Sequence, residues 1–214
     1  MLKYVESVKI NKYVGGLIVS DKIKGSLLLT TAAMIWGSSF IVMKSAVDFL
    51  TPNVLLFVRF SLATVIMSII FYKYVKDINI KDLKGGMITG TCLFLAYLIQ
   101  TIGLTMTTPG KNAFLTAVYC AIVPFLVWFF YRRRPDSYNF FAALLCIVGV
   151  GFVSLDGNLG MNMGDLLTLI GGLFYAFHIL AIKKYSNTMH PIKLTTLQFA
   201  MTAILAFFGS LLFE

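Results

Sequence analysis

The residues best suited to bind a ligand stand at the head of one apolar segment, TTPGKNAFLTAVYCAIVP, which covers residues 107–124. Lys111 and Asn112 come directly after Pro109 and Gly110, where a helix is expected to begin. The N-terminus of a helix attracts anions, so a substrate carboxylate or phosphate is one expected partner of Lys111. The alternative is that Lys111 extends to the lipid headgroups.

Gln100, Tyr119 and Pro124 add polarity and a helix breaker to the same region. A proline inside a helix removes one backbone hydrogen bond, and in a membrane bundle cavity water or a neighbouring side chain can satisfy the freed carbonyl. We therefore expect a kinked, cavity-lining helix, with Gln100 and Tyr119 as candidates for substrate contact. The alternative for these two side chains is an interhelical hydrogen bond worth about 0.6 kcal/mol.

Arg59 is a charged residue inside an apolar run. It lies about 10 Å beyond Pro52 at ~1.5 Å per residue of helix. A charge at the centre of a membrane helix costs at least ~2.5 kcal/mol, so such a residue usually faces the bundle interior or a water-filled cavity. We expect Arg59 either to contact substrate or to pair with Asp48 or with free carbonyls at a helix end.

Four further candidates lie near the middle of two other apolar runs, namely Trp36, Ser39, Tyr175 and His178. Aromatic residues at that depth are candidates for the walls of a cavity, whereas interfacial aromatic residues lie at the membrane surfaces. Packing is the alternative. His178 can titrate near neutral pH and is a candidate proton relay, against a hydrogen-bonded packing role.

The composition identifies the solvent that these residues face. The chain of 214 residues is 58% hydrophobic and 13% charged, with a mean hydropathy of +0.85. Soluble domains are about 45–50% apolar and about 25% charged. The sequence therefore predicts an integral membrane protein.

The apolar residues form blocks, each near the ~20 residues that cross ~30 Å of hydrocarbon as a helix. No alternating ten-residue pattern typical of a transmembrane β-barrel is present. We predict an all-α helical bundle, with seven helices in this chain, at residues 26–43, 53–74, 87–106, 113–131, 138–155, 166–182 and 194–213.

The basic residues predict the orientation. Fifteen of the eighteen Lys and Arg residues fall at one side when the ends of the blocks are assigned alternately. By the positive-inside rule, this side is cytoplasmic. We therefore predict a multi-pass protein of the cytoplasmic membrane with a cytoplasmic N-terminal basic tail over residues 1–24. The net charge of +9 then reflects contact with the lipid bilayer, and we expect no nucleic acid partner.

The sequence contains an internal repeat. A shift of 139 residues aligns GSLLLTTAAMIWGSSFIVMK with GDLLTLIGGLFYAFHILAIK and keeps its register into the following helix. The shift places Gln198 at the position equivalent to Arg59. The matched pairs are Gly25 with Gly164, Lys44 with Lys183, Pro52 with Pro191, and Phe60 with Phe199.

Five predicted helices separate the starts of the two copies, so the second copy must enter the membrane upside down. Inverted repeats are typical of secondary transporters, whose sites lie near the midplane between the repeats. We expect a first repeat over residues 25–155 and the start of a second repeat over residues 164–214.

Several segments carry a family resemblance. In chain order they are MIWGSSFIVMK, FVRF, LIQTIGLTMTTPGKNAFLTAVYCAIVPFLVWFF and IVGVGFVSL, and they resemble the EamA-type drug/metabolite transporter superfamily. The resemblance implies ten helices in two inverted five-helix repeats, a central cavity and transport of small organic molecules. Many members carry an acidic residue just after the fourth helix, where this chain reads YRRRPD.

The second repeat contains only two helices here, which leaves several expectations open. The chain is either a truncated ten-helix permease, a short protein completed by a homodimer or a partner chain, or an inactive remnant. A membrane scaffold or assembly subunit that does not transport is the alternative function.

The sequence does not favour an enzyme. It has no phosphate-binding glycine loop with a lysine, and its Asp residues lie mostly in predicted loops, among them Asp82 and Asp165. Cys92, Cys120 and Cys146 lie in different helices without metal-site spacing. We expect no cofactor and no metal site, and a small-molecule substrate.

Overall fold

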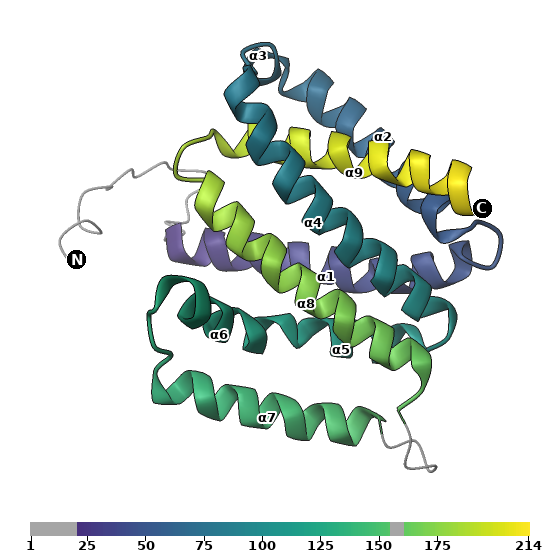
Figure 1. Cartoon of the computed structure of the whole chain (residues 1–214), viewed down its shortest axis with the longest axis vertical. Helices are drawn as coiled ribbons and strands as arrows, with labels where there is room; N and C mark the ends of the chain where they lie inside the picture. The colour runs from purple at the N-terminus through teal and green to yellow at the C-terminus, as the bar shows by residue number, and fades with distance from the viewer. Residues whose placement is uncertain (1–20, 155–160) are drawn as a thin grey trace, which may run out of the picture. The chain divides into compact units, whose positions relative to one another are not determined.

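The structure, a computed structural model, describes residues 21–154 and 161–214, and the described residues form helices without strands (Figure 1). This confirms the predicted all-α membrane bundle. The helices are α1 (Asp21–Ala46), α2 (Pro52–Ile70), α3 (Tyr72–Val75), α4 (Ile80–Thr105), α5 (Pro109–Ala117), α6 (Tyr119–Tyr131), α7 (Ser137–Ser154), α8 (Met163–Tyr185) and α9 (Pro191–Phe213).

Six stretches of the described chain are long and apolar enough to cross a membrane. Helices α5 and α6 together form one of them, Pro109–Tyr131, and the others lie in α1, α2, α4, α8 and α9. The fifth predicted block, residues 138–155, corresponds to α7, whose apolar part, Ser137–Val153, is shorter than these six stretches. The last predicted residue of that block, Leu155, and the basic tail up to residue 20 lie outside the described residues.

Some helix ends differ from the prediction because caps, not apolarity, set them. Helix α4 begins at Ile80, seven residues before the predicted start, because Asn79 and Asp82 form a capping box. The Asp82 backbone N–H donates to Asn79 Oδ1 over 3.0 Å, and the Asn79 N–H donates to Asp82 Oδ2 over 3.1 Å. The expectation that Asp82 lies in a loop is therefore wrong.

The chain divides into two compact units, residues 1–39 and residues 40–214. The described part of the first unit is the helix from Asp21 to Ser39. The hydroxyl groups of Thr31, Ser38 and Ser39 donate to carbonyl oxygens of the same helix, and the bond from Ser39 Oγ to the Trp36 oxygen is 2.6 Å long. Two candidate residues, Trp36 and Ser39, therefore belong to this unit.

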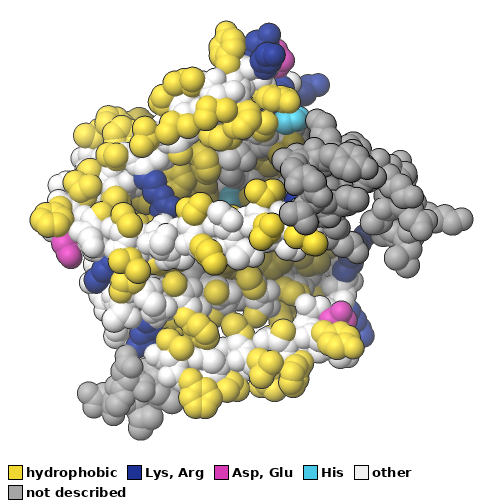
Figure 2. Space-filling view, turned by 180° about the vertical axis from the view of Figure 1, so that it is seen from behind, with side chains coloured by type: hydrophobic (Ala, Val, Ile, Leu, Met, Phe, Trp, Pro, Cys, Tyr) yellow, Lys and Arg dark blue, Asp and Glu magenta, His cyan; other side chains and the backbone are white. Residues whose placement is uncertain are grey.

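In the second unit, α4 packs against both α8 and α9, and α2 packs against α9 (Figure 1). The core between them contains Leu56, Phe60, Ala96 and Tyr175, all buried. Many large apolar side chains point outward instead, and Figure 2 shows them spread over the helices of the visible face. Apolar side chains on the outer surface are expected where hydrocarbon is the solvent.

Glycine residues let α4 approach its neighbours closely. A Cβ at Gly86 would lie 2.4 Å from Leu197 Cβ, and one at Gly90 would lie 2.5 Å from Met201 Cβ, so only glycine fits at both positions against α9. Gly86 and Gly90 therefore serve packing within the chain. Small residues serve this purpose in membranes because packing, not the hydrophobic effect, holds the helices together.

The helix ends follow the predicted repeat. Helices α2 and α9 both begin with proline, at Pro52 and Pro191, the two positions that the 139-residue shift equates. The rings of the equivalent residues Phe60 and Phe199 also lie in contact, with centroids 5.5 Å apart. If two inverted copies are related by an axis, equivalent residues that touch must lie beside that axis. The contact between Phe60 and Phe199 agrees with such a repeat, and the repeat itself stays a prediction.

Helix packing at Gly90 can be tested by substitution. Gly90→Ala would force α4 and α9 apart, whereas among the described residues nothing lies within 4 Å of a Cβ at Gly151 in α7. Alanine forms helices better than glycine by about 1 kcal/mol. We expect Gly90→Ala to lower the melting temperature of the purified protein and Gly151→Ala to leave or raise it. A rise in both variants would contradict the close packing.

Candidate functional site

A chain of buried polar side chains crosses from α8 to α4 and α5. Tyr175 donates its hydroxyl proton to Gln100 Oε1 over 2.9 Å, and Gln100 Nε2 donates to Thr116 Oγ1 over 2.6 Å. Thr116 in turn donates to the Asn112 carbonyl oxygen over 2.8 Å. The structure thus brings three predicted candidates, Gln100, Asn112 and Tyr175, into one hydrogen-bonded network.

Asn112 connects the same network back to α8. Its Nδ2 donates to Thr168 Oγ1 over 2.7 Å and to the Gln100 carbonyl oxygen over 3.2 Å. Asn112 Oδ1 is buried and has no hydrogen-bond partner among the described residues. A buried polar atom without a partner is costly, so this oxygen is a place where water or a ligand donor would be stabilised.

The break between α5 and α6 positions this network. Pro109 starts α5, and Thr108 caps it by accepting from the Lys111 backbone N–H over 3.3 Å. Helix α5 ends after Ala117, and Pro124 lies within α6. The helix is interrupted at Val118, six residues before the proline, and the kink expected at Pro124 stays a prediction.

Lys111 forms a buried ion pair. Its Nζ lies 3.0 Å from Asp165 Oδ2, with the lysine side chain 9% exposed and the aspartate 0% exposed. Thr107 Oγ1 also donates to Asp165 Oδ1 over 2.8 Å. Asp165 is the third residue of α8, where it forms a capping box with Asn162, so its expected place in a loop is wrong. The Asn-x-x-Asp spacing was the sequence signal for this cap.

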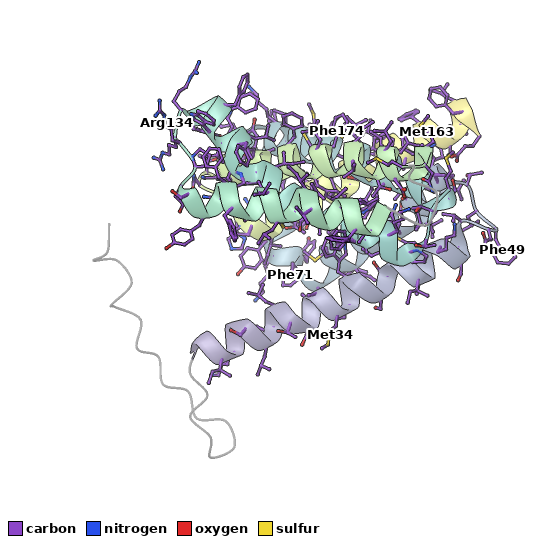
Figure 3. All side chains as sticks on the ribbon, turned by 90° about the horizontal axis from the view of Figure 1, so that it is seen from below. Met34, Phe49, Phe71, Arg134, Met163 and Phe174 are labelled. Carbon is purple, nitrogen blue, oxygen red and sulfur yellow. The ribbon has the colours of Figure 1, made fainter. Side chains whose placement is uncertain are left out.

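A pocket of about 370 Å³ lies beside this ion pair. Lys44 and Lys111 line it, with residues 105–109 and Asn162. Lys44 Nζ donates to the Leu104 carbonyl oxygen over 2.8 Å, at the end of α4. The labelled residues Met163 and Phe174 in Figure 3 mark the stretch of α8 in which Asp165 and Thr168 lie.

Arg59 is half-buried on α2, among sulfur and aromatic groups. Its Nη1 donates to Met43 Sδ over 2.9 Å, and its guanidinium carbon lies 5.0 Å from the Tyr97 ring centroid and 5.9 Å from that of Phe60. Within the described ranges 21–154 and 161–214, no carboxylate forms an ion pair with Arg59. The alternative pairing with Asp48 is therefore not observed.

Tyrosine rings connect Arg59 with the polar network. Tyr97 packs edge-on against Tyr175, with centroids 5.3 Å apart, and Tyr119 lies 5.9 Å from Tyr175. Sequence reasoning missed Tyr97, because its place between Arg59 and Tyr175 depends on how α2, α4 and α8 pack. The cluster places a cation, three phenol rings and the Gln100 amide close together.

His178 occupies a separate polar contact between α8 and α9. Its Nε2 lies 2.9 Å from Gln198 Oε1, and both side chains are buried. Gln198 is the residue that the repeat equates with Arg59. Of the nine candidates, seven lie in the second unit, and Trp36 and Ser39 lie in the first.

The sequence also matches a known family. The model of the EamA-like transporter family matches residues 23–155. The chain belongs to this family. An uncharacterized transporter from Archaeoglobus fulgidus is 34% identical over 207 residues, which are 95% of this chain and 64% of that protein. The family match and this relative support a membrane transporter, as the sequence predicts.

More distant relatives of this EamA-family chain occur in Bacillus subtilis. The uncharacterized transporter YrdR is 26% identical over 70% of this chain and 50% of its own length, and YetK is 24% identical over 86% and 59%. The chain spans between 50% and 64% of the length of these three curated relatives. No solved structure matches the EamA-family chain significantly.

The polar network makes a stability prediction. Tyr175→Phe keeps the ring but removes the donor to Gln100 Oε1, and a buried acceptor left unpaired costs about 1–3 kcal/mol. We expect a lower melting temperature for the purified protein. Tyr72→Phe, on the exposed short helix α3, is the matched control and should not change it. Equal melting of both variants would show that the network contributes no stability.

Proposed function

We propose that this chain is part of a secondary transporter that moves small organic metabolites or drugs across the cytoplasmic membrane by alternating access. The observation that carries the proposal is the buried polar network from Tyr175 through Gln100 to Asn112 in an otherwise apolar bundle. Polar side chains in membrane helices face the bundle interior or a path, and they mark sites of function.

Arg59 is the proposed charged contact for the substrate. Lys111 is held by Asp165, whereas the described partners of Arg59 are a thioether and aromatic rings. A guanidinium has five N–H donors and matches carboxylate or phosphate groups well. The substrate is therefore proposed to carry an anionic group against Arg59 and an apolar or aromatic part against Tyr97, Tyr119 and Tyr175.

The predicted inverted repeat supports alternating access. Rocking of one repeat against the other exposes a central site to each face in turn. The contact between the equivalent residues Phe60 and Phe199 supports an axis through the packed centre of the second unit. The distribution of lysine and arginine supports a cytoplasmic N-terminus.

Transport is tested by flux into vesicles. The purified protein is reconstituted into liposomes, and uptake is measured for a panel of radiolabelled amino acids, organic acids and nucleosides. Solute-dependent uptake above that of protein-free liposomes is expected. Absence of flux for every solute in the panel would overturn the proposal and favour the scaffold role.

The role of Arg59 predicts a selective loss of transport. Loss of a charged contact worth about 1.4 kcal/mol lowers affinity tenfold. We expect Arg59→Gln to reduce uptake of anionic solutes by about tenfold at low concentration. Lys84→Gln, which neutralises an exposed charge on α4, is the matched control and should retain uptake. Full activity in Arg59→Gln would remove Arg59 from the substrate site.

A further inference from the structure

Two ion pairs lie at opposite ends of α4. Asp82, in its first turn, lies 3.5 Å from Lys193 Nζ, measured at Oδ2. The Lys111–Asp165 pair lies at the other end, since α5 begins only four residues after Thr105. Helix α4 has 26 residues, so its ends are about 39 Å apart at 1.5 Å per residue.

The two pairs are built in the same way. Each aspartate is the third residue of a helix and belongs to an Asn-x-x-Asp capping box, with Asn79 for Asp82 and Asn162 for Asp165. Each lysine is the third residue of a helix that begins with proline, in PGK at residues 109–111 and PIK at residues 191–193. The pairs join α4 to α9 and α5 to α8.

Each pair also joins the two predicted repeats. Asp82 and Lys111 belong to residues 25–155, whereas Lys193 and Asp165 belong to residues 164–214. A rocking motion of one repeat against the other would lengthen the contact at one end of α4 and keep or shorten it at the other. The same motion cannot preserve both ion pairs unless the repeats stay in their present arrangement.

We propose that Lys111–Asp165 and Asp82–Lys193 are two latches that close the transporter at its opposite faces. This inference rests on the proposed function, since it assigns a part to each pair in alternating access. Both latches are closed in this structure, which corresponds to an occluded arrangement. Opening to either face breaks the latch at that face while the other latch holds.

The surroundings of the latches fit this role. Lys111 and Asp165 are buried, so separating them requires water to hydrate both charges. The pocket of about 370 Å³ lined by Lys44 and Lys111 lies where that water would enter. At the other end Lys193 Nζ also donates to the Asp77 carbonyl oxygen over 2.5 Å, which joins α9 to the residues just before α4.

Distances between spin labels test the latches without a known substrate. In protein with Cys92, Cys120 and Cys146 replaced by alanine, one label pair is placed at Gly110 and Met161 and another at Lys81 and Asn187. All four label positions are exposed and lie near one latch or the other. Pulsed electron spin resonance on protein in lipid nanodiscs then gives the distance distribution at each end.

Each latch is removed by two substitutions together, Lys111→Gln with Asp165→Asn, or Asp82→Asn with Lys193→Gln. Removing one partner alone would leave a buried unpaired charge and loosen the fold for that reason. The double variant leaves two neutral polar side chains, so it avoids the cost of a buried unpaired charge. The ion pair is still lost, so any effect of the latch remains visible. Lys84→Gln is the control for a change of charge on α4.

A reciprocal result supports the latches. We expect loss of Lys111–Asp165 to shift the 110–161 distances to longer values without lengthening those of 81–187, and loss of Asp82–Lys193 to do the reverse. Longer distances at both ends, or unchanged distances at both, would overturn the inference. If solute flux is observed without a reciprocal shift, only the latch proposal is rejected. If a reciprocal shift is observed without solute flux, only the proposed transport function is rejected.

Discussion

The constraint on which the structure depends is that hydrocarbon offers no hydrogen bonds. Every backbone polar group in a span must be satisfied inside the protein, so the described chain is helical, and its polar side chains must find one another. This constraint explains why Gln100, Asn112, Thr116 and Thr168 converge, although they come from three helices. It also explains why Lys111 and Asp165, far apart in the sequence, are paired.

The same constraint decides how much the sequence could predict. Apolar blocks predicted the spans well, because length and hydropathy alone determine where a helix can cross a membrane. The start of α4 was missed by seven residues, because Asn79 and Asp82 extend the helix through the polar residues beyond the apolar block. Helix ends depend on such local caps, which hydropathy does not register.

The site was predicted residue by residue but not as a set of contacts. Gln100 stood out as a polar residue in an apolar run, Asn112 by its place at a helix start and Tyr175 as an aromatic residue within a span. Their hydrogen bonds, however, depend on how α4, α5 and α8 cross. One sequence carries no record of that crossing. Asp165 was placed in a loop because the capping box with Asn162 was overlooked, whereas its pairing with Lys111 could come only from the fold.

The network from Tyr175 to Asn112 has a fixed direction. A backbone carbonyl only accepts, so the bond to the Asn112 oxygen orients the Thr116 hydroxyl, which must then accept from the Gln100 amide nitrogen and leave Oε1 to accept from Tyr175. An amide cannot pass on a proton without leaving its stable tautomer. The network therefore does not conduct protons. A proton that moves along α8 would have to follow a route that avoids Gln100.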